Sequence, residues 1–111
     1  MSAFFPGFIT KLPEADIPLE GLKAYLSQGS NHQIVFMAFE KDVELAEHSH
    51  ASQYGIVLEG KIDLVIDGIS HIFVKGDRYV IPEGVIHSGK IYAGYADVSF
   101  FDEADRYQAK G

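Results

Sequence analysis

Two histidines that stand two residues apart, His48 and His50, are the side chains in this sequence with the clearest potential for chemistry. Alternate side chains of a β-strand leave the same face, so this spacing predicts two imidazoles side by side. Neutral imidazole is the commonest metal ligand in proteins, and such a pair forms half of a coordination site. A pair of polar surface residues is the plainer interpretation. A third histidine, His87, ends a patterned segment that begins at Gly76, and it favours the metal site.

Length and composition restrict the class of protein. A chain of 111 residues with 47% hydrophobic and 23% charged residues is typical of one globular domain. The net charge of −7 argues against nucleic acid or an anionic membrane as the partner, because both require clustered basic residues. The absence of cysteine excludes disulfides and thiolate chemistry, and leaves His, Asp, Glu and Gln as possible metal ligands.

We expect a single domain with an N-terminal arm over residues 1–21, a barrel over 22–101 and a C-terminal tail over 102–111. The first twelve residues are interrupted by Pro6-Gly7 and lack the features of a signal peptide. No apolar run is long enough to span a membrane, and a cytoplasmic location is the default expectation. From Gly21 onward, turn residues recur every eight to twelve residues between β-branched and aromatic runs, which predicts an all-β sandwich or barrel with little or no helix. The expected strands are Leu22–Ser27, Gln33–Glu40, Val43–His50, Gln53–Leu58, Lys61–Ile66, Ile69–Lys75, Tyr79–Ile81, Val85–Ser88 and Ala96–Phe101.

Two turns set the expected register. Asp67-Gly68 between apolar runs predicts a type I′ hairpin, and Glu59-Gly60 predicts a second hairpin more weakly. Directly opposed residues share a face of the sheet. Two-residue loops would pair Ile66 with Ile69, Leu64 with His71, Ile62 with Phe73, Val57 with Ile62, Gly55 with Leu64 and Gln53 with Ile66. The face that these residues share would be the interior.

The opposite face of the same strands is also largely apolar. It carries Tyr54, Ile56, Leu58, Val65, Ile72 and Val74. Monomers rarely expose large apolar patches, so we expect this face to be covered. A homodimer through the outer face is the leading expectation, and packing of the chain's own termini over it is the alternative.

The two histidine segments together resemble the two sequence motifs of the cupin superfamily, which are small β-barrels of the jelly-roll type built from two antiparallel sheets. The second motif is matched by Gly76, Pro82, Gly84 and His87, with Ile91 in place of its final Asn. The first is matched by His48, His50 and Gly60, with Asp42 in place of its opening Gly and Gln53 in place of its Glu.

A closer resemblance, over roughly residues 48–107, is to single-domain cupins of the pectin-degradation type. Those proteins help to convert unsaturated uronates into linear keto sugars. The resemblance implies that Asp97 is an active-site carboxylate, and that an arginine shortly after it binds substrate. Arg106 is the nearest arginine. The match there is poor, because Phe101-Asp102-Glu103 stands where the family has a Phe/Pro/Arg segment.

The resemblance implies one divalent ion held by His48, His50, Gln53 and His87. Gln53 keeps an oxygen donor without the charge, and either binds the ion or supports those residues that do. An uncharged ligand set leaves the ion its full charge, which suits a small anionic substrate. Fe, Mn, Ni, Zn and Cu are all compatible with imidazole ligands.

Three other side chains have open roles. Asp97 is either a general acid or base, or a residue at a strand end that is exposed to solvent or paired with Arg106. His71 is expected on the interior face, either hydrogen-bonded in the core or in the substrate cavity away from the metal, with a fourth imidazole ligand as the alternative. Tyr79 is expected to line the barrel mouth or to pack there.

Three functions are compatible with these residues. The leading hypothesis is a metalloenzyme that catalyses isomerisation, ring opening or elimination on a small sugar acid or keto acid. The second is an Fe(II)-dependent dioxygenase, and the third is a non-catalytic barrel that binds a small ligand.

Overall fold

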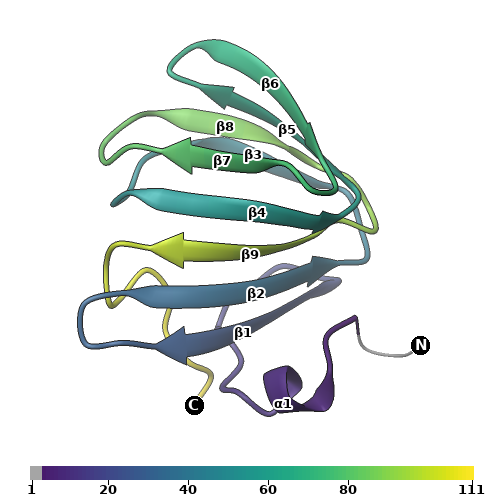
Figure 1. Cartoon of the computed structure of the whole chain (residues 1–111), viewed down its shortest axis with the longest axis vertical. Coiled ribbons are helices and arrows are strands. Elements are labelled where there is room, and N and C mark those ends of the chain that lie inside the picture. Colours follow the sequence, from purple (N-terminus) through teal and green to yellow (C-terminus); the bar gives the residue numbers. More distant parts are fainter. Residues whose placement is uncertain (1–3) are drawn as a thin grey trace.

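The computed structural model describes residues 4–111, and these fold into nine strands and one short helix (Figure 1). The sequence-based expectation of an all-β fold with almost no helix is confirmed. The elements are α1 (Gly7–Thr10), β1 (Leu22–Gln28), β2 (Gln33–Phe39), β3 (Val43–His48), β4 (Gln53–Glu59), β5 (Lys61–Ile66), β6 (Ile69–Val74), β7 (Arg78–Ile81), β8 (His87–Ile91) and β9 (Ala96–Phe101).

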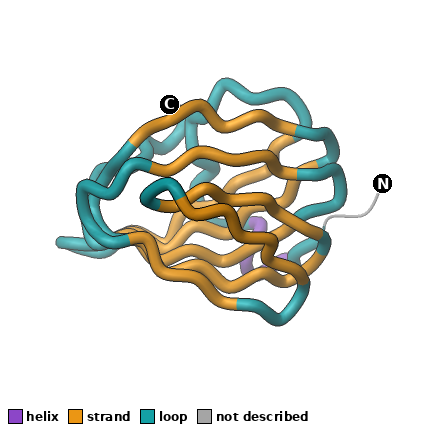
Figure 2. The backbone as a smooth tube through the Cα atoms, turned by 90° about the horizontal axis from the view of Figure 1, so that it is seen from above, coloured by secondary structure: helices purple, strands orange, loops and turns teal. Residues whose placement is uncertain are grey.

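The strands form two antiparallel sheets that enclose a common interior (Figure 2). One sheet has five strands in the order β1-β2-β9-β4-β7, and the other has four in the order β3-β8-β5-β6. Among the described strands, only β1–β2 and β5–β6 are consecutive and paired, so every other connection carries the chain from one sheet to the other. This is the jelly-roll arrangement, which the sequence motifs predict.

Strict alternation of side chains builds the core between the sheets. In β2, Val35, Met37 and Phe39 are buried, whereas Ile34, Phe36 and Ala38 point to the outer side of the sheet. A strand with this pattern has one face in an apolar interior, and burial of that face is the main stabilising contribution. The core cluster includes Leu26, Val57, Ile62, Leu64, Tyr79, Ile81, Ile91, Tyr95 and Phe101.

The hairpin predicted at Asp67-Gly68 is confirmed. Both residues have positive φ, 52° and 77°, as a type I′ turn requires. The pairing of β5 with β6 follows the predicted register, with Ile66 opposite Ile69 and Leu64 opposite His71.

The hairpin predicted at Glu59-Gly60 is wrong, because β4 and β5 lie in different sheets. β4 pairs with β7 and β9 instead, and Gln53 stands opposite Ile81 and Phe101. Gly60 has a different reason to be glycine. Its φ is 75°, and a Cβ there would lie 2.7 Å from Cα of Tyr95, so the crossover turn packs directly on the backbone that enters β9.

The separation of β4 from β5 also divides the predicted outer face between the two sheets. Tyr54 lies on the outer side of the five-stranded sheet, whereas Ile72 and Val74 lie on the edge strand of the other. No helix among the described residues combines the length and the apolar character that a membrane crossing requires.

Beyond β9 the chain does not leave the barrel. We call residues 102–110 the C-terminal strap, because backbone hydrogen bonds fix them along their length. Asp102 N–H donates to Ser52 O, and near the other end Lys110 N–H donates to Glu14 O over 2.9 Å.

Candidate metal centre

Three histidines meet at one end of the four-stranded sheet. β3 ends at His48 and the adjacent strand β8 begins at His87, so these two residues are direct neighbours in the ladder. His50 lies in the loop after β3, not on the strand as its spacing predicts, because β3 ends at His48. The loop nevertheless brings its ring to 5.4 Å from that of His48 and 4.7 Å from that of His87.

Backbone carbonyls fix the tautomer of all three rings. Nδ1 of His48 donates to Ala46 O over 2.8 Å, and Nδ1 of His50 donates to Ala51 O over 2.6 Å. Nδ1 of His87 donates to Val85 O over 3.0 Å. A carbonyl oxygen can only accept, so each neutral ring has its proton on Nδ1 and a free lone pair on Nε2. A hydrogen bond from the other ring nitrogen to a backbone carbonyl is typical of metal-binding histidines.

The chemistry of this donor set fits a cation. One nitrogen of each histidine lies within 4.8 Å of the others, and Nε2 of His50 is 3.1 Å from Nε2 of His87. Two lone pairs at that distance repel each other unless a proton or a metal ion lies between them. Burial lowers the pKa of His50 and of His87 and thus disfavours the proton. The three residues would hold a divalent ion, and all three line the cavity.

Gln53 lies beside the histidines and lines the same cavity of about 100 Å³. Its Nε2 donates to Ser99 Oγ over 3.0 Å and reaches the Tyr79 hydroxyl at 3.5 Å. The amide nitrogen is therefore engaged on the five-stranded sheet, and the amide oxygen is the atom that could serve as a ligand.

Asp97 is buried deeper in the cavity and is only 4% exposed, so it is not a surface residue at a strand end. Its Oδ2 accepts hydrogen bonds from Tyr95 over 2.5 Å and from Tyr79 over 3.4 Å. Burial raises the pKa of Asp97 to about 7, although the hydrogen bonds from Tyr95, Tyr79 and Ser99 lower it. Among the described residues Oδ1 has no hydrogen-bond partner, which leaves it for a ligand or a proton.

The side chain of Tyr79 lies across β4 because the residue beneath its ring is a glycine. Gly55 is its partner across β4 and β7, and a Cβ at Gly55 would lie 2.3 Å from Cζ of Tyr79. The ring therefore lies flat over β4, and its hydroxyl connects Gln53 with Asp97. Burial raises the pKa of Tyr79 and of Tyr95 far above the ordinary value, so both hydroxyls stay protonated donors.

Arg106 and Tyr107 of the C-terminal strap line the same cavity. The guanidinium carbon lies 4.4 Å from the centre of the Tyr107 ring and 5.8 Å from that of Phe101. In the part of the chain that the structure describes, Nε of Arg106 is buried without a hydrogen-bond partner. A buried unpaired donor is costly, so an acceptor from a bound ligand would relieve it.

His71 does not belong to this site, which corrects the expectation of an interior histidine. It is exposed on β6 and does not line the cavity. The predicted register is right, and Leu64 opposite His71 is buried, but β6 is an edge strand on which no residue is fully buried. His71 stacks on Phe73, which stacks on Tyr79, so Phe73 separates it from the cavity.

Two buried polar side chains that bond to residues lining the cavity were not predicted. The hydroxyl of Tyr95, which lies directly before β9, donates to Asp97, a contact that the sequence motifs do not indicate. Gln33 is fully buried at an inward position of β2. Its signal was a polar residue that begins the alternating run Gln33-x-Val35-x-Met37.

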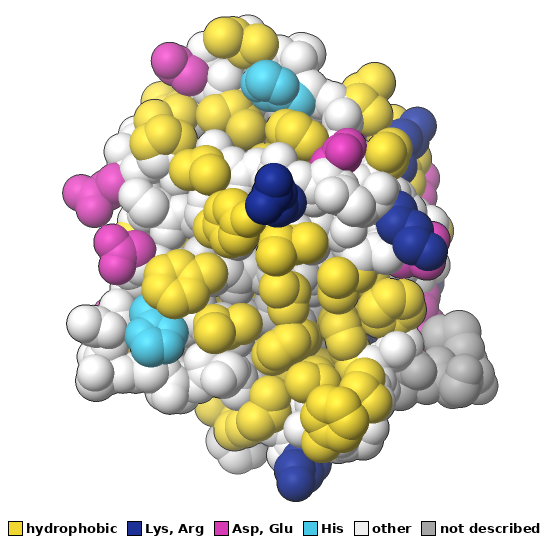
Figure 3. Space-filling model, in the orientation of Figure 1, with side chains coloured by type: hydrophobic (Ala, Val, Ile, Leu, Met, Phe, Trp, Pro, Cys, Tyr) yellow, Lys and Arg dark blue, Asp and Glu magenta, His cyan; other side chains and the backbone are white. Residues whose placement is uncertain are grey.

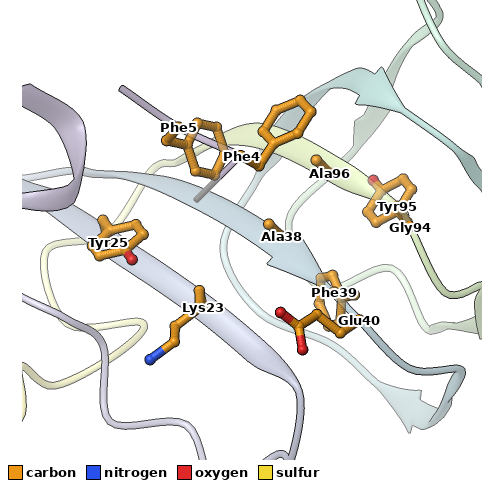
Figure 4. Close-up of a pocket in the computed structure, with 10 residues that line it drawn as sticks. All are labelled: Phe4, Phe5, Lys23, Tyr25, Ala38, Phe39, Glu40, Gly94, Tyr95 and Ala96. Atoms are coloured by element: carbon orange, nitrogen blue, oxygen red, sulfur yellow. The ribbon is translucent and has the colours of Figure 1, made fainter. Parts of the chain in front are cut away.

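A larger cavity of about 600 Å³ lies elsewhere, on the outer side of the five-stranded sheet (Figure 4). Phe4 and Phe5 lie over one part of it, and Lys23 and Glu40 lie at another (Figure 4). None of the residues predicted for the site lines it, so cavity size alone does not locate the chemistry.

The fold and the three imidazoles define a jelly-roll barrel with a histidine metal-binding cluster at one end. The family model described as the cupin domain matches residues 35–101, which is more than half of the chain. The chain therefore belongs to the cupin family. No curated protein matches it significantly.

Solved structures show the same fold. An RmlC-like cupin from Shewanella frigidimarina is 25% identical, with a TM-score of 0.75, and the alignment covers 96% of this chain and 95% of that one. KdgF from a Halomonas species is 18% identical, with a TM-score of 0.70 and coverage of 84% and 89%. Salicylate 1,2-dioxygenase from Pseudoaminobacter salicylatoxidans, solved with gentisate, is 21% identical with a TM-score of 0.66, over 78% of this chain and 26% of that one.

Proposed function

We propose that this cupin is a metal-dependent enzyme that acts on a small anionic acid, by isomerisation, ring opening or elimination. The observation that carries the proposal is the convergence of three Nε2 lone pairs, each fixed by a backbone carbonyl on Nδ1. A divalent ion held there by neutral ligands would polarise a carboxylate or carbonyl group of the substrate.

The chain's own residues have separate roles in this proposal. Arg106 binds the substrate carboxylate, because its buried Nε needs an acceptor. Asp97 gives or takes a proton at Oδ1, while Tyr95 and Tyr79 hold its other oxygen. A pKa near 7 suits a group that transfers protons at neutral pH. Gln53 completes the ligand set through its amide oxygen.

Elemental analysis of His87→Ala is the first test. The untagged wild-type protein, purified without chelator, should contain close to one metal ion per chain. His87→Ala should lose most of that metal, because two imidazoles rarely hold an ion alone. His71→Ala is the matched control and should keep the metal, since His71 is exposed outside the site. A folded wild-type protein that takes up no Mn, Fe, Ni or Zn would overturn the proposal.

The two other hypotheses are separated by further measurements. Oxygen uptake with a diol or diketone substrate would indicate an Fe(II)-dependent dioxygenase. A protein whose His48→Ala and His50→Ala variants still bind the ligand would be a non-catalytic binding barrel.

We also propose that the protein is a homodimer through the outer side of the five-stranded sheet. On this face Tyr54, Val80 and Phe100 are exposed, and Figure 3 shows hydrophobic side chains in a band across it. The N-terminal arm covers only one part, where the Phe5 ring packs on Tyr25 and Phe36. The rest of the apolar band is exposed, and this supports the proposal that a second copy of the chain covers it.

A further inference from the structure

The cavity beside the histidines is small. Its volume is about 100 Å³, and residues of both sheets and of the C-terminal strap line it. Ligand sites for drug-sized molecules usually have about 300–1,000 Å³. The site therefore has room for a few ligand atoms next to the ion, and not for a sugar ring.

The C-terminal strap closes one side of this cavity. Arg106 and Tyr107 are its contributions to the lining, and the Tyr107 ring packs at 5.7 Å against that of Phe101. Bonds on both sides of these residues hold the strap down. Gln28 Nε2 donates to Ala104 O over 2.8 Å, and Asp16 N–H donates to Gln108 O over 2.7 Å.

Gln33 holds the middle of the strap from inside the barrel. Its side-chain amide pairs with the backbone of Tyr107 in both directions: Nε2 donates to Tyr107 O over 2.8 Å, and Oε1 accepts from Tyr107 N over 3.0 Å. Nε2 also donates to Gln28 Oε1 over 2.8 Å. Gln33 has no exposed surface, so these bonds are shielded from water. These bonds fix the backbone of Tyr107, and they thereby also restrict its neighbour Arg106, which lines the cavity.

We propose that Gln33 is a positioning residue that sets the size of the substrate: by anchoring the strap at Tyr107 it keeps the cavity compact and limits access to short 2-keto or 2-hydroxy acids. Such an acid offers a carboxylate to Arg106 and a neighbouring oxygen to the ion. The inference rests on the proposed function and selects, within it, the compact acids over the uronates that the pectin-type resemblance implies.

Calorimetric titration of the Mn²⁺-loaded protein tests the size limit with two probes. Pyruvate is short, and galacturonate carries its carboxylate on a sugar ring. The wild-type protein should bind pyruvate on the order of tenfold more tightly than galacturonate or better. Gln33→Leu should bind pyruvate more weakly and lose most of this preference, while its Mn²⁺ content stays unchanged.

Gln108→Leu is the matched control, because it makes the same chemical change on the exposed side of the same strap. It should keep the wild-type preference. Hydrogen exchange at the Tyr107 amide gives a readout independent of any ligand: exchange should accelerate in Gln33→Leu and not in Gln108→Leu. If Gln33→Leu does not fold, Tyr107→Ala removes the ring from the cavity wall and should admit galacturonate.

The outcomes separate the two proposals. Equal binding of pyruvate and galacturonate by the wild-type protein, or an unchanged preference in Gln33→Leu, would overturn the size limit and leave the proposed function standing. A Mn²⁺-loaded protein that binds neither acid would overturn both.

Discussion

The buried carboxyl group of Asp97 links protonation to stability at the scale of a single residue. Its pKa is about 7 in the folded protein and about 4 in an unfolded chain, because burial disfavours the charged form. The folded state therefore binds a proton that the unfolded state releases between pH 4 and pH 7. It follows that the contribution of Asp97 to stability is full below pH 4 and is lost as the pH rises through 7.

We predict that metal-free wild-type protein loses up to about 4 kcal/mol of unfolding free energy from this group between pH 4 and pH 8. Asp97→Asn removes the titration, so the difference in unfolding free energy between the two proteins should change in that interval. Urea unfolding of both proteins at a series of pH values, with chelator present, measures it. If the difference in unfolding free energy does not change with pH, the pKa of Asp97 is not raised in the folded protein.

At the scale of the element, the crossover from β4 to β5 depends on Gly60. Gly60→Ala should destabilise the protein by about 1–3 kcal/mol, because the new Cβ would combine a strained positive φ with a contact of 2.7 Å to the Tyr95 backbone. Gly68→Ala is the matched control: its φ of 77° is similar, but nothing lies within 4 Å of its Cβ position. Thermal unfolding should show a larger loss for Gly60→Ala than for Gly68→Ala.

The same element shows how far the sequence predicts this fold. Local turn chemistry was sufficient at Asp67-Gly68, where two residues of positive φ close a hairpin. At Glu59-Gly60 a weaker signal of the same kind was misleading, because whether two strands pair or cross between sheets depends on contacts far along the chain, here with Tyr95. The prediction of inward-facing residues from side-chain alternation does not depend on this pairing. Val57, Ile62 and Leu64 are buried as predicted, although β4 and β5 do not pair.

The site was predictable to a similar extent. The motif spacing identified the three histidines that the structure brings together. The hydrogen bonds of Tyr95 and Gln33 were not predictable, because each joins residues whose proximity only the folded barrel creates. For His71 the pairing with Leu64 was predicted correctly, but its exposure was not, because the sequence does not show that β6 is an edge strand.

At the scale of the whole molecule, the apolar outer side of the five-stranded sheet predicts the oligomeric state. Val80→Glu should convert a dimer into a monomer in sedimentation equilibrium, because Val80 is 59% exposed on that face and burial of a charge in an interface is costly. Ile72→Glu is the matched control on the other sheet, where Ile72 is 66% exposed, and it should leave the dimer intact. A wild-type protein that sediments as a monomer would contradict the proposed interface.

The three histidines come from two segments that are distant in sequence, residues 48–50 at the end of β3 and residue 87 at the start of β8. An ion bound to them would cross-link the segment between His48 and His87 and would bind the folded chain far better than the unfolded one. Mass action then makes the free energy of unfolding rise with the logarithm of the free-metal concentration once that concentration exceeds the dissociation constant. The melting temperature would thus report free metal, and the ion that raises it most at equal concentration would be the best candidate for the native one.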